Sequence, residues 1–177
     1  MTINDTRISE ILISGERIQA RIAALAGDIA RDYAGRELVL VGVLKGSVMF
    51  LADLSRALTI PHVFDMVGAA SYLGGTASTG SVIITKDIHL PIRDKHVLLV
   101  EDIYDTGRTM RVIVDLLKVH QPASLEICAL LYKEKPHDED MPVKYIGFRI
   151  PDRFVVGYGL DYDEHFRNLP FIAEFKP

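Results

Sequence analysis

Three carboxylates stand close together near the middle of the chain, directly after a run of apolar residues. Glu101 and Asp102 follow residues 97–100, and Asp105 comes three positions later. Residues 106–110 include a glycine and lead into a helical pattern, so their backbone N–H groups would lie at the start of a helix, where an anion can bind. Carboxylates would repel a bare polyphosphate, but they suit the hydroxyl groups of a sugar whose phosphate occupies the turn. This stretch therefore predicts a site for a ribose 5-phosphate.

The acidic stretch lies between a predicted strand and a predicted helix. Residues 97–100 are apolar without interruption, which is typical of a parallel strand buried on both faces. After the turn, apolar residues recur on one side of a helix, at Met110, Ile113, Val114 and Leu117. Ligands of open α/β sheets bind at the carboxyl ends of the strands, so we expect the turn at that edge. The sequence has no GxGxxG, GxxxxGKS or GxxxxGKT motif, which excludes the common nucleotide-binding loops.

A second strand, loop and helix unit precedes the acidic one. Residues 38–43 form another continuous apolar run and lead into a loop that contains Lys45 and Gly46. The inward face of the helix that follows is expected to hold Phe50, Leu51, Leu54 and Leu58. By pattern alone, Lys45 is either a solvated loop lysine or a cation at the ligand edge. Ser14 is expected to cap an earlier helix that serves as scaffold.

Two further segments follow predicted strands at the same edge of the sheet. The predicted strand at residues 63–67 ends in residues 68–80, which are rich in glycine and small side chains. This stretch is either a functional lid or a slack surface hairpin. Lys133 stands just past the predicted strand at residues 124–131, so we expect its side chain at the edge that carries the other polar loops.

The composition is that of one globular domain. Of 177 residues, 49% are apolar and 25% are charged, and the net charge of −4 argues against a general nucleic-acid binder. No signal-peptide pattern is visible, and no apolar run approaches the ~20 residues of a membrane span, so the cytoplasm is the expected location. Cys128 lies in an apolar run, as a buried, inert thiol would. The acidic residues 138–140 are interpreted as a solvated loop without a metal.

Residues 100–109, Val-Glu-Asp-Ile-Tyr-Asp-Thr-Gly-Arg-Thr, resemble the phosphoribosyl pyrophosphate (PRPP) signature of the type I phosphoribosyltransferases. Their details are similar to the hypoxanthine-guanine branch of that family. Three more segments match the family in its order: the Leu-Lys-Gly turn at 44–46, the Ser-Tyr pair at 71–72, and the run at 147–162, which is similar to a nucleobase-binding hood. The likeness extends from about Leu38 to Arg167.

The resemblance implies a single α/β domain over residues 1–177, with a central, mostly parallel, twisted sheet flanked by helices. A small hood would be formed by the terminal segments, and a flexible loop beginning with Ser71 and Tyr72 would close over the site and exclude water. The expected boundaries are about 36–135 for the core, about 1–13 and 136–177 for the hood, and about 71–81 for the loop.

The resemblance also implies an enzyme of purine salvage. Such enzymes transfer ribose 5-phosphate from PRPP to a purine and release pyrophosphate, with Mg²⁺ as the metal. For this chain, the likeness implies hypoxanthine and guanine as acceptors and IMP and GMP as products. It further implies a homodimer or homotetramer, and neither nucleic acid nor a membrane is an expected partner. The ammonium group of Lys133 can only donate hydrogen bonds, which favours a 6-oxopurine over adenine.

The resemblance assigns roles to the positions that match the family motifs. Asp105 aligns with the residue that takes the proton from purine N7 or stabilises it there. Lys133 would donate to the purine 6-oxygen, and Phe154 would stack on the base. PRPP would be bound by Lys45, Gly46, Glu101, Asp102, Asp105, Thr106, Gly107, Arg108, Thr109 and Arg167. The purine would be bound by Lys133, Phe154, Val155 and Asp161. The metal ligands would be Glu101, Asp102 and Asp161.

Alternatives to this activity stay open. Some phosphoribosyltransferase-like domains are regulatory nucleotide- or PRPP-binding proteins, although these usually carry an added DNA-binding domain, a basic face or a degraded acidic motif. Another alternative is a phosphoribosyltransferase that prefers xanthine or acts on a pyrimidine. Tyr104 replaces a smaller aliphatic residue often found in the family, and we expect its ring near the purine pocket. The family's Leu-Lys peptide can be cis, which here concerns Leu44 and Lys45.

Overall fold

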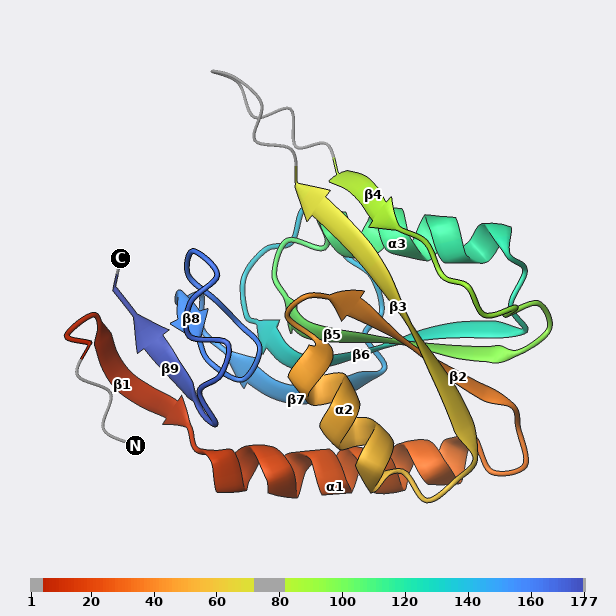
Figure 1. Ribbon diagram of the computed structural model, residues 1–177, viewed down its shortest axis with the longest axis horizontal. Helices are drawn as coiled ribbons and strands as arrows, with labels where there is room; N and C mark the ends of the chain where they lie inside the picture. Colours follow the sequence, from red (N-terminus) through yellow and green to blue (C-terminus); the bar gives the residue numbers. More distant parts are fainter. Residues whose placement is uncertain (1–4, 72–81, 177) are drawn as a thin grey trace.

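The computed structural model describes residues 5–71 and 82–176, which form two sheets and three helices. Figure 1 shows the larger sheet between its helices, with the smaller sheet beside it. The elements are β1 (Ile8–Ile13), α1 (Gly15–Asp32), β2 (Leu38–Leu44), α2 (Val48–Ala57), β3 (His62–Ser71), β4 (Val82–Lys86), β5 (His96–Tyr104), α3 (Arg108–Val119), β6 (Ser124–Lys133), β7 (Tyr145–Ile150), β8 (Val155–Val156) and β9 (Ile172–Phe175).

The larger sheet has six strands in the order β4-β3-β2-β5-β6-β7. Its strands pair in parallel except for β3 and β4, which are antiparallel. Successive side chains of the central strands point to opposite faces, so each strand contributes to two cores. The core under α1 and α2 includes Leu38, Leu40, Leu98 and Val100. The core under α3 includes Val39, Val41, Val97 and Leu99. The predicted fold class, a mostly parallel sheet flanked by helices, is confirmed.

The helices bury the faces that their apolar spacing predicts. Ser14 caps α1, because its side chain accepts a hydrogen bond from the Arg17 N–H at 3.4 Å. The buried residues of α3 are Met110, Ile113, Val114 and Leu117, as predicted. Within residues 5–71 and 82–176, no helix combines the length and the hydropathy needed to cross a membrane.

The strands β5 and β6 run further than the sequence predicts. We expected the first to end at Val100, and this was wrong: the strand continues through the acidic pair to Tyr104. Backbone pairing with β6 explains the extension, because Ile103 and Tyr104 remain paired with Leu131 and Tyr132. Polar side chains do not interrupt a ladder that main-chain groups form. The two acids are therefore held by the sheet and not by a loop.

The smaller sheet is antiparallel, with the order β1-β9-β8, and joins parts of the chain that are distant in sequence. Ile8 pairs with Phe175 in its register. The strand β8 has only two residues, because Gly157 and Gly159 both adopt a φ of +99°, which interrupts an extended strand. The strand β7, although within the expected hood, pairs with β6 in the larger sheet.

The expected lid begins at the end of β3, whose last residue is Ser71. Tyr72 and the rest of the expected loop, to residue 81, lie outside the described residues. The lid therefore stays a prediction.

Asp65 on β3 binds the segment that follows β4. Its carboxylate accepts hydrogen bonds from the backbone N–H groups of Met66, His89 and Leu90 at 2.7, 2.6 and 2.9 Å, and the Lys86 ammonium lies at 3.3 Å. Burial by itself would raise the pKa of Asp65, but the backbone N–H groups and Lys86 outweigh it and lower the pKa to about 2.

We expect this carboxylate to stabilise the fold by roughly 2 kcal/mol above pH 4. Its pKa is lower in the folded protein than in the unfolded chain, so the stabilisation is present above about pH 4 and is lost as the pH falls towards 2. Urea unfolding of Asp65→Asn and wild type should differ clearly at pH 6 and less at pH 3. Asp115→Asn, on the exposed side of α3, is the control. An equal difference at both pH values would contradict the prediction.

Candidate active site

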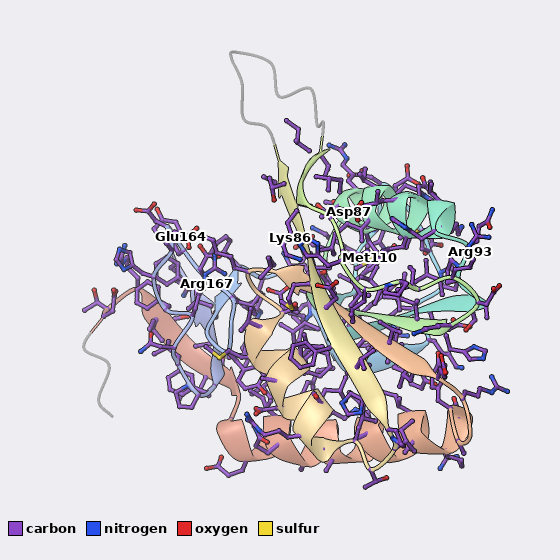
Figure 2. All side chains as sticks on the ribbon, turned by 45° about the vertical axis from the view of Figure 1, so that its right-hand side comes forward. Lys86, Asp87, Arg93, Met110, Glu164 and Arg167 are labelled. Atoms are coloured by element: carbon purple, nitrogen blue, oxygen red, sulfur yellow. The ribbon has the colours of Figure 1, made fainter. Side chains whose placement is uncertain are left out.

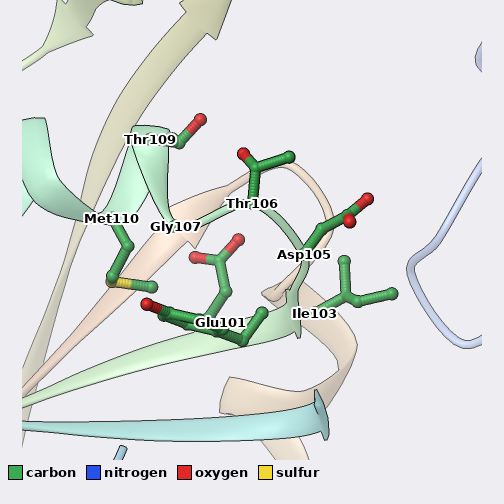
Figure 3. Close-up of a pocket in the computed structure, with 8 residues that line it drawn as sticks. Glu101, Ile103, Asp105, Thr106, Gly107, Thr109 and Met110 are labelled. Atoms are coloured by element: carbon green, nitrogen blue, oxygen red, sulfur yellow. The ribbon is translucent and has the colours of Figure 1, made fainter. Parts of the chain in front are cut away.

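Two adjoining pockets lie at the carboxyl ends of β2 and β5. The smaller, of about 270 Å³, is lined by the end of β5 and by the turn at residues 105–109 (the 105–109 turn). Figure 3 shows the Glu101 carboxylate in this pocket, directed towards the side of the turn that carries Thr106. The larger pocket, of about 580 Å³, is lined by residues of at least five separate segments, among them Lys45, Asp102, Asp161 and Arg167. Glu101 and Thr109 line both pockets, so the two form one continuous site.

The 105–109 turn leads directly into α3 at a residue that must be glycine. Gly107 is the N-cap of α3 and has a φ of +82°, a left-handed conformation that side chains disfavour. A Cβ atom there would lie 2.1 Å from the Glu139 carbonyl oxygen and 2.8 Å from the Tyr104 hydroxyl. Glycine therefore lets the turn pack closely against residue 139, and the start of α3, where backbone N–H groups can bind a phosphate, lies beside the smaller pocket.

The loop at residues 138–141 packs on the turn and holds it. The Tyr104 hydroxyl donates to the Glu139 carbonyl and accepts from the Met141 N–H at 3.1 Å. Arg108 pairs with Asp138 at 2.8 Å, and a second arginine of α3 pairs with Glu139 at 3.1 Å. Two of the three acids that we interpreted as solvated therefore contact the helix of the site.

The ring of Tyr104 is 1% exposed and stacks on Tyr132, with centroids 5.3 Å apart. His137 packs against both rings edge-on. Tyr104 thus contributes to the floor of the smaller pocket and braces the turn. Cys128 is fully buried, and burial raises the pKa of its thiol, as its apolar surroundings in the sequence indicate.

The adjacent acids Glu101 and Asp102 form an electrostatically unfavourable pair. Burial raises the pKa of Glu101 well above its usual range, and the neighbouring Asp102 raises it further. Burial also raises the pKa of Asp102. The Glu101 Oε2 atom is buried and has no hydrogen-bond partner among the described residues. Such a carboxylate is stabilised when a cation or a hydroxyl group approaches it, which is what a ligand in this site would supply.

Replacing Glu101 by glutamine is expected to raise the free energy of unfolding at pH 7 by about 1–2 kcal/mol. The folded protein must either bury this charge or take up a proton, and the amide removes that cost while it can donate to Asp102. Because the pKa of Glu101 is higher in the folded state, the cost grows as the pH rises above about 4.5 and is absent below it.

Urea unfolding at pH 7 and pH 4 measures this gain, which should be smaller at pH 4. Glu134→Gln, an exposed glutamate beyond β6, is the matched control and should have little effect at either pH. A Glu101→Gln variant that is less stable than wild type at pH 7 would show that the carboxylate is well accommodated.

The Lys45 loop is built on close backbone contacts. The Leu44-Lys45 peptide is cis, as it can be in the family that the sequence resembles. A Cβ atom at Gly46 would lie 1.7 Å from the Asp102 Oδ2 atom, so the loop passes directly over that carboxylate. The Gly46 carbonyl in turn lies against Gly159, where a Cβ atom would approach it to 2.0 Å. Glycine at both positions lets the loop, β5 and the segment after β8 meet at one point.

The segment between β8 and β9 supplies charged groups to the larger pocket. Arg167 pairs with Asp161 at 2.9 Å and with Glu164 at 3.3 Å, and it donates to the Gly159 carbonyl at 2.7 Å. Glu164 also pairs with Lys45 at 3.0 Å. Figure 2 shows Glu164 and Arg167 on this segment. The structure therefore brings together Lys45, Asp161 and Arg167, and it adds Glu164, which the sequence analysis did not single out.

Four charged groups meet at the end of β6. The Lys133 ammonium lies 3.1 Å from the Asp105 Oδ2 atom and 3.1 Å from the Asp152 Oδ1 atom. Lys135 pairs with the same Asp152 atom at 3.2 Å and also with Asp105. We call these four residues the lysine-aspartate cluster. Sequence reasoning missed Lys135 and Asp152. No local pattern marks either residue, because Lys135 follows β6 in a turn and Asp152 reaches the cluster from the loop after β7.

Phe154 and Val155 lie directly after this cluster in the chain. Val155 is buried as the first residue of β8, whereas Phe154 is 46% exposed and packs beside Tyr162 and Phe175, each with ring centroids 6.0 Å away. Because Asp152 contacts Lys133, the segment that carries the exposed ring begins at the edge of the site. The predicted roles of these residues, like those of the other site residues, stay predictions.

An acid-lined sheet edge next to the N-terminus of a helix is the arrangement that the sequence analysis predicts for a sugar-phosphate site. The chain belongs to the phosphoribosyl transferase domain family, whose model matches residues 9–163. It is 46% identical over 167 residues to the hypoxanthine phosphoribosyltransferase of Salmonella typhimurium, covering 93% of this chain and 94% of that relative. It is 46% identical over 170 residues to the hypoxanthine-guanine phosphoribosyltransferase of Staphylococcus aureus, covering 96% and 95%. A crystal structure of a hypoxanthine phosphoribosyltransferase from Staphylococcus aureus superimposes with a TM-score of 0.92 at 44% identity, covering 99% of this chain and 97% of the other.

Proposed function

We propose that the protein transfers the 5-phosphoribosyl group of PRPP to N9 of hypoxanthine or guanine, which yields IMP or GMP and pyrophosphate. The observation that carries this proposal is the continuous site of two pockets, in which an anion-binding turn, two buried acids and a separate set of cations share one edge of the sheet. A ribose with phosphoryl groups at both ends requires these three features in this order. The names of the relatives support the same acceptor bases.

The phosphoribosyl half of the reaction is assigned to the two pockets. The 105–109 turn would hold the 5′-phosphate, with Thr106, Gly107, Arg108 and Thr109 supplying backbone and side-chain donors. Glu101 and Asp102 would accept hydrogen bonds from the ribose hydroxyls, which fits the unpartnered oxygen of Glu101. Lys45 and Arg167 would bind the pyrophosphate and stabilise the charge that develops on it as it leaves.

Mg²⁺ is the metal that we propose for this site. Glu101, Asp102 and Asp161 line the larger pocket, and the buried, unpartnered Glu101 oxygen fits the approach of a hard cation. Among the described residues, no group of three His, Cys, Asp or Glu side chains has the geometry of a metal site. Magnesium held by one or two carboxylates and by substrate phosphates is compatible with that arrangement, and when bound it neutralises charge on the diphosphate.

The purine half is assigned to the lysine-aspartate cluster and the segment after it. Asp105 would accept the proton of purine N7, and Lys133 would donate to the 6-oxygen. Phe154 would stack on the base and Val155 would contact its edge, beside Asp161. A donor-only group opposite position 6 rejects the amino group of adenine, because two donors would face each other without an acceptor. The site therefore selects 6-oxopurines.

The cytoplasm and a homodimeric or homotetrameric assembly remain predictions from the family resemblance. The regulatory alternative needs a partner-binding surface, whereas the complete set of acids at residues 101, 102 and 105 supports catalysis. A preference for xanthine is the closer alternative, because xanthine also carries a 6-oxo group.

One experiment tests the proposal and its alternatives together. The purified protein is given PRPP and Mg²⁺ with hypoxanthine, guanine, xanthine or adenine in parallel, and nucleotide formation is followed by absorbance. We expect rapid formation of IMP and GMP and little AMP. Faster formation of XMP would establish the xanthine alternative. No nucleotide from any base, with PRPP still bound, would support a regulatory protein.

A further inference from the structure

The lysine-aspartate cluster is a closed ring of four charges. Each ammonium contacts both carboxylates, and each carboxylate contacts both ammonium groups, with distances of 3.1 to 3.2 Å for three of the four pairs. The side chains of Lys133 and Lys135 are 10% and 22% exposed, so both cations are partly withdrawn from water. Pairs in such surroundings are less screened than pairs on the open surface.

Backbone hydrogen bonds fix the position of the second lysine. The Lys135 N–H donates to the Lys133 carbonyl at 3.1 Å, which forms a tight turn between the two lysines. The Glu134 N–H donates to the Ile150 carbonyl at 2.8 Å and ties this turn to β7. Lys135 is therefore held beside Lys133 by the main chain and is not a freely moving surface lysine.

The ring leaves Lys133 with a defined capacity for further hydrogen bonds. An ammonium group has three N–H donors. Asp105 accepts one of them at 3.1 Å, and the Asp152 carboxylate is ion-paired with the same ammonium group at 3.1 Å. At least one donor remains for a ligand. Without Lys135, Lys133 would be the single cation of the lysine-aspartate cluster. Both carboxylates would then attract its ammonium group more strongly. Lys135 thus pairs with the same two carboxylates and leaves Lys133 free to direct one donor towards a ligand.

We propose that Lys135 is a positioning residue that acts through Lys133 and Asp105 to set the affinity for the purine. The proposal rests on the proposed function, because it assigns the free donor of Lys133 to the 6-oxygen of the base. Lys135 itself does not touch the substrate. Asp152 serves the same purpose as the second shared carboxylate.

A purely structural role for Lys135 predicts a different result. Ion pairs at the surface contribute little to stability, so the loss of one would leave both Michaelis constants nearly unchanged. Loss of a group that orients Lys133 would instead affect binding of the purine and spare PRPP, whose proposed phosphate and ribose ligands lie at residues 106–109 and in the larger pocket. The ratio of the two effects separates the two roles.

The test compares Lys135→Met, Lys135→Arg and wild type in steady-state assays with hypoxanthine and PRPP varied separately. We expect Lys135→Met to raise the KM for hypoxanthine about tenfold, with the KM for PRPP within about twofold of wild type. Lys135→Arg should restore the hypoxanthine KM to within about threefold of wild type, because a guanidinium can bridge the same two carboxylates. Lys95→Met is the matched control, since Lys95 pairs with Glu37 at the opposite edge of the sheet.

The possible outcomes are distinct. A hypoxanthine KM for Lys135→Met within about twofold of wild type, an equal rise of both Michaelis constants, or no restoration by arginine would overturn the positioning role. If Lys135→Met does not fold, as judged by circular dichroism, Asp152→Asn replaces it and must show the same purine-specific rise. A wild-type protein that makes no nucleotide from any 6-oxopurine would instead refute the proposed function.

Discussion

Replacing Asp105 by alanine is expected to lower kcat for IMP formation by about 10²–10⁴-fold. The carboxylate stands where the 105–109 turn begins, and it lies 3.1 Å from the Lys133 ammonium, which we assign to the same base. A positioned carboxylate that accepts a proton as the C–N bond forms acts in the transition state, so its loss lowers kcat more than it raises either KM.

The measurement is nucleotide formation at saturating PRPP and hypoxanthine. Asp105→Asn keeps the shape of the side chain but removes its basicity, and we expect a loss of similar size. Asp115→Asn on the exposed side of α3 should retain wild-type turnover. Turnover of Asp105→Ala within about tenfold of wild type would remove this residue from the role of base.

The second large effect is expected for Lys133→Ala, which should raise the KM for hypoxanthine about 10²-fold. The substitution removes the donor that we assign to the 6-oxygen and leaves that oxygen without a partner in the site. The KM for PRPP should change less than about threefold, because Lys133 lines neither the smaller nor the larger pocket.

Lys95→Ala controls for the loss of a lysine, and thermal unfolding shows whether the variant is folded. Lys135 remains beside both carboxylates in Lys133→Ala, so we expect the fold to be retained. Equal rises of both Michaelis constants would contradict the assignment of Lys133 to the purine. Guanine should give the same pattern, since it carries the same 6-oxo group.

Local patterns predicted the central elements well. The helix at residues 108–119 and its buried face followed from apolar spacing, because a single stripe of α3 packs on the sheet. The apolar runs at residues 38–43 and 97–100 predicted the central strands β2 and β5, because parallel sheets require apolar residues in strands buried on both faces. We predicted the end of β5 too early, because we used side-chain polarity, whereas backbone pairing with β6 determines where the strand ends.

The site was predicted in its main residues and missed in their partners. Local motifs marked the acids, Lys45 and Lys133, whereas Lys135, Asp152 and Glu164 carry no motif of their own. Asp152 reaches Lys133 across 19 positions of the chain and Glu164 reaches Lys45 across 119. Pairs of this kind depend on how the loops meet in three dimensions, and hydrophobic spacing contains no information about that.

The smaller sheet has a consequence for how the protein is made. Its middle strand, β9, comes last of all the elements, and the early strand β1 pairs with it. During synthesis on the ribosome, β1 therefore cannot pair with β9 until residue 175 has emerged, although the larger sheet can already assemble. A nascent chain that stops before β9 would contain the turn and the acids of the larger sheet, but it would lack the smaller sheet that follows Phe154, the residue that we propose stacks on the base.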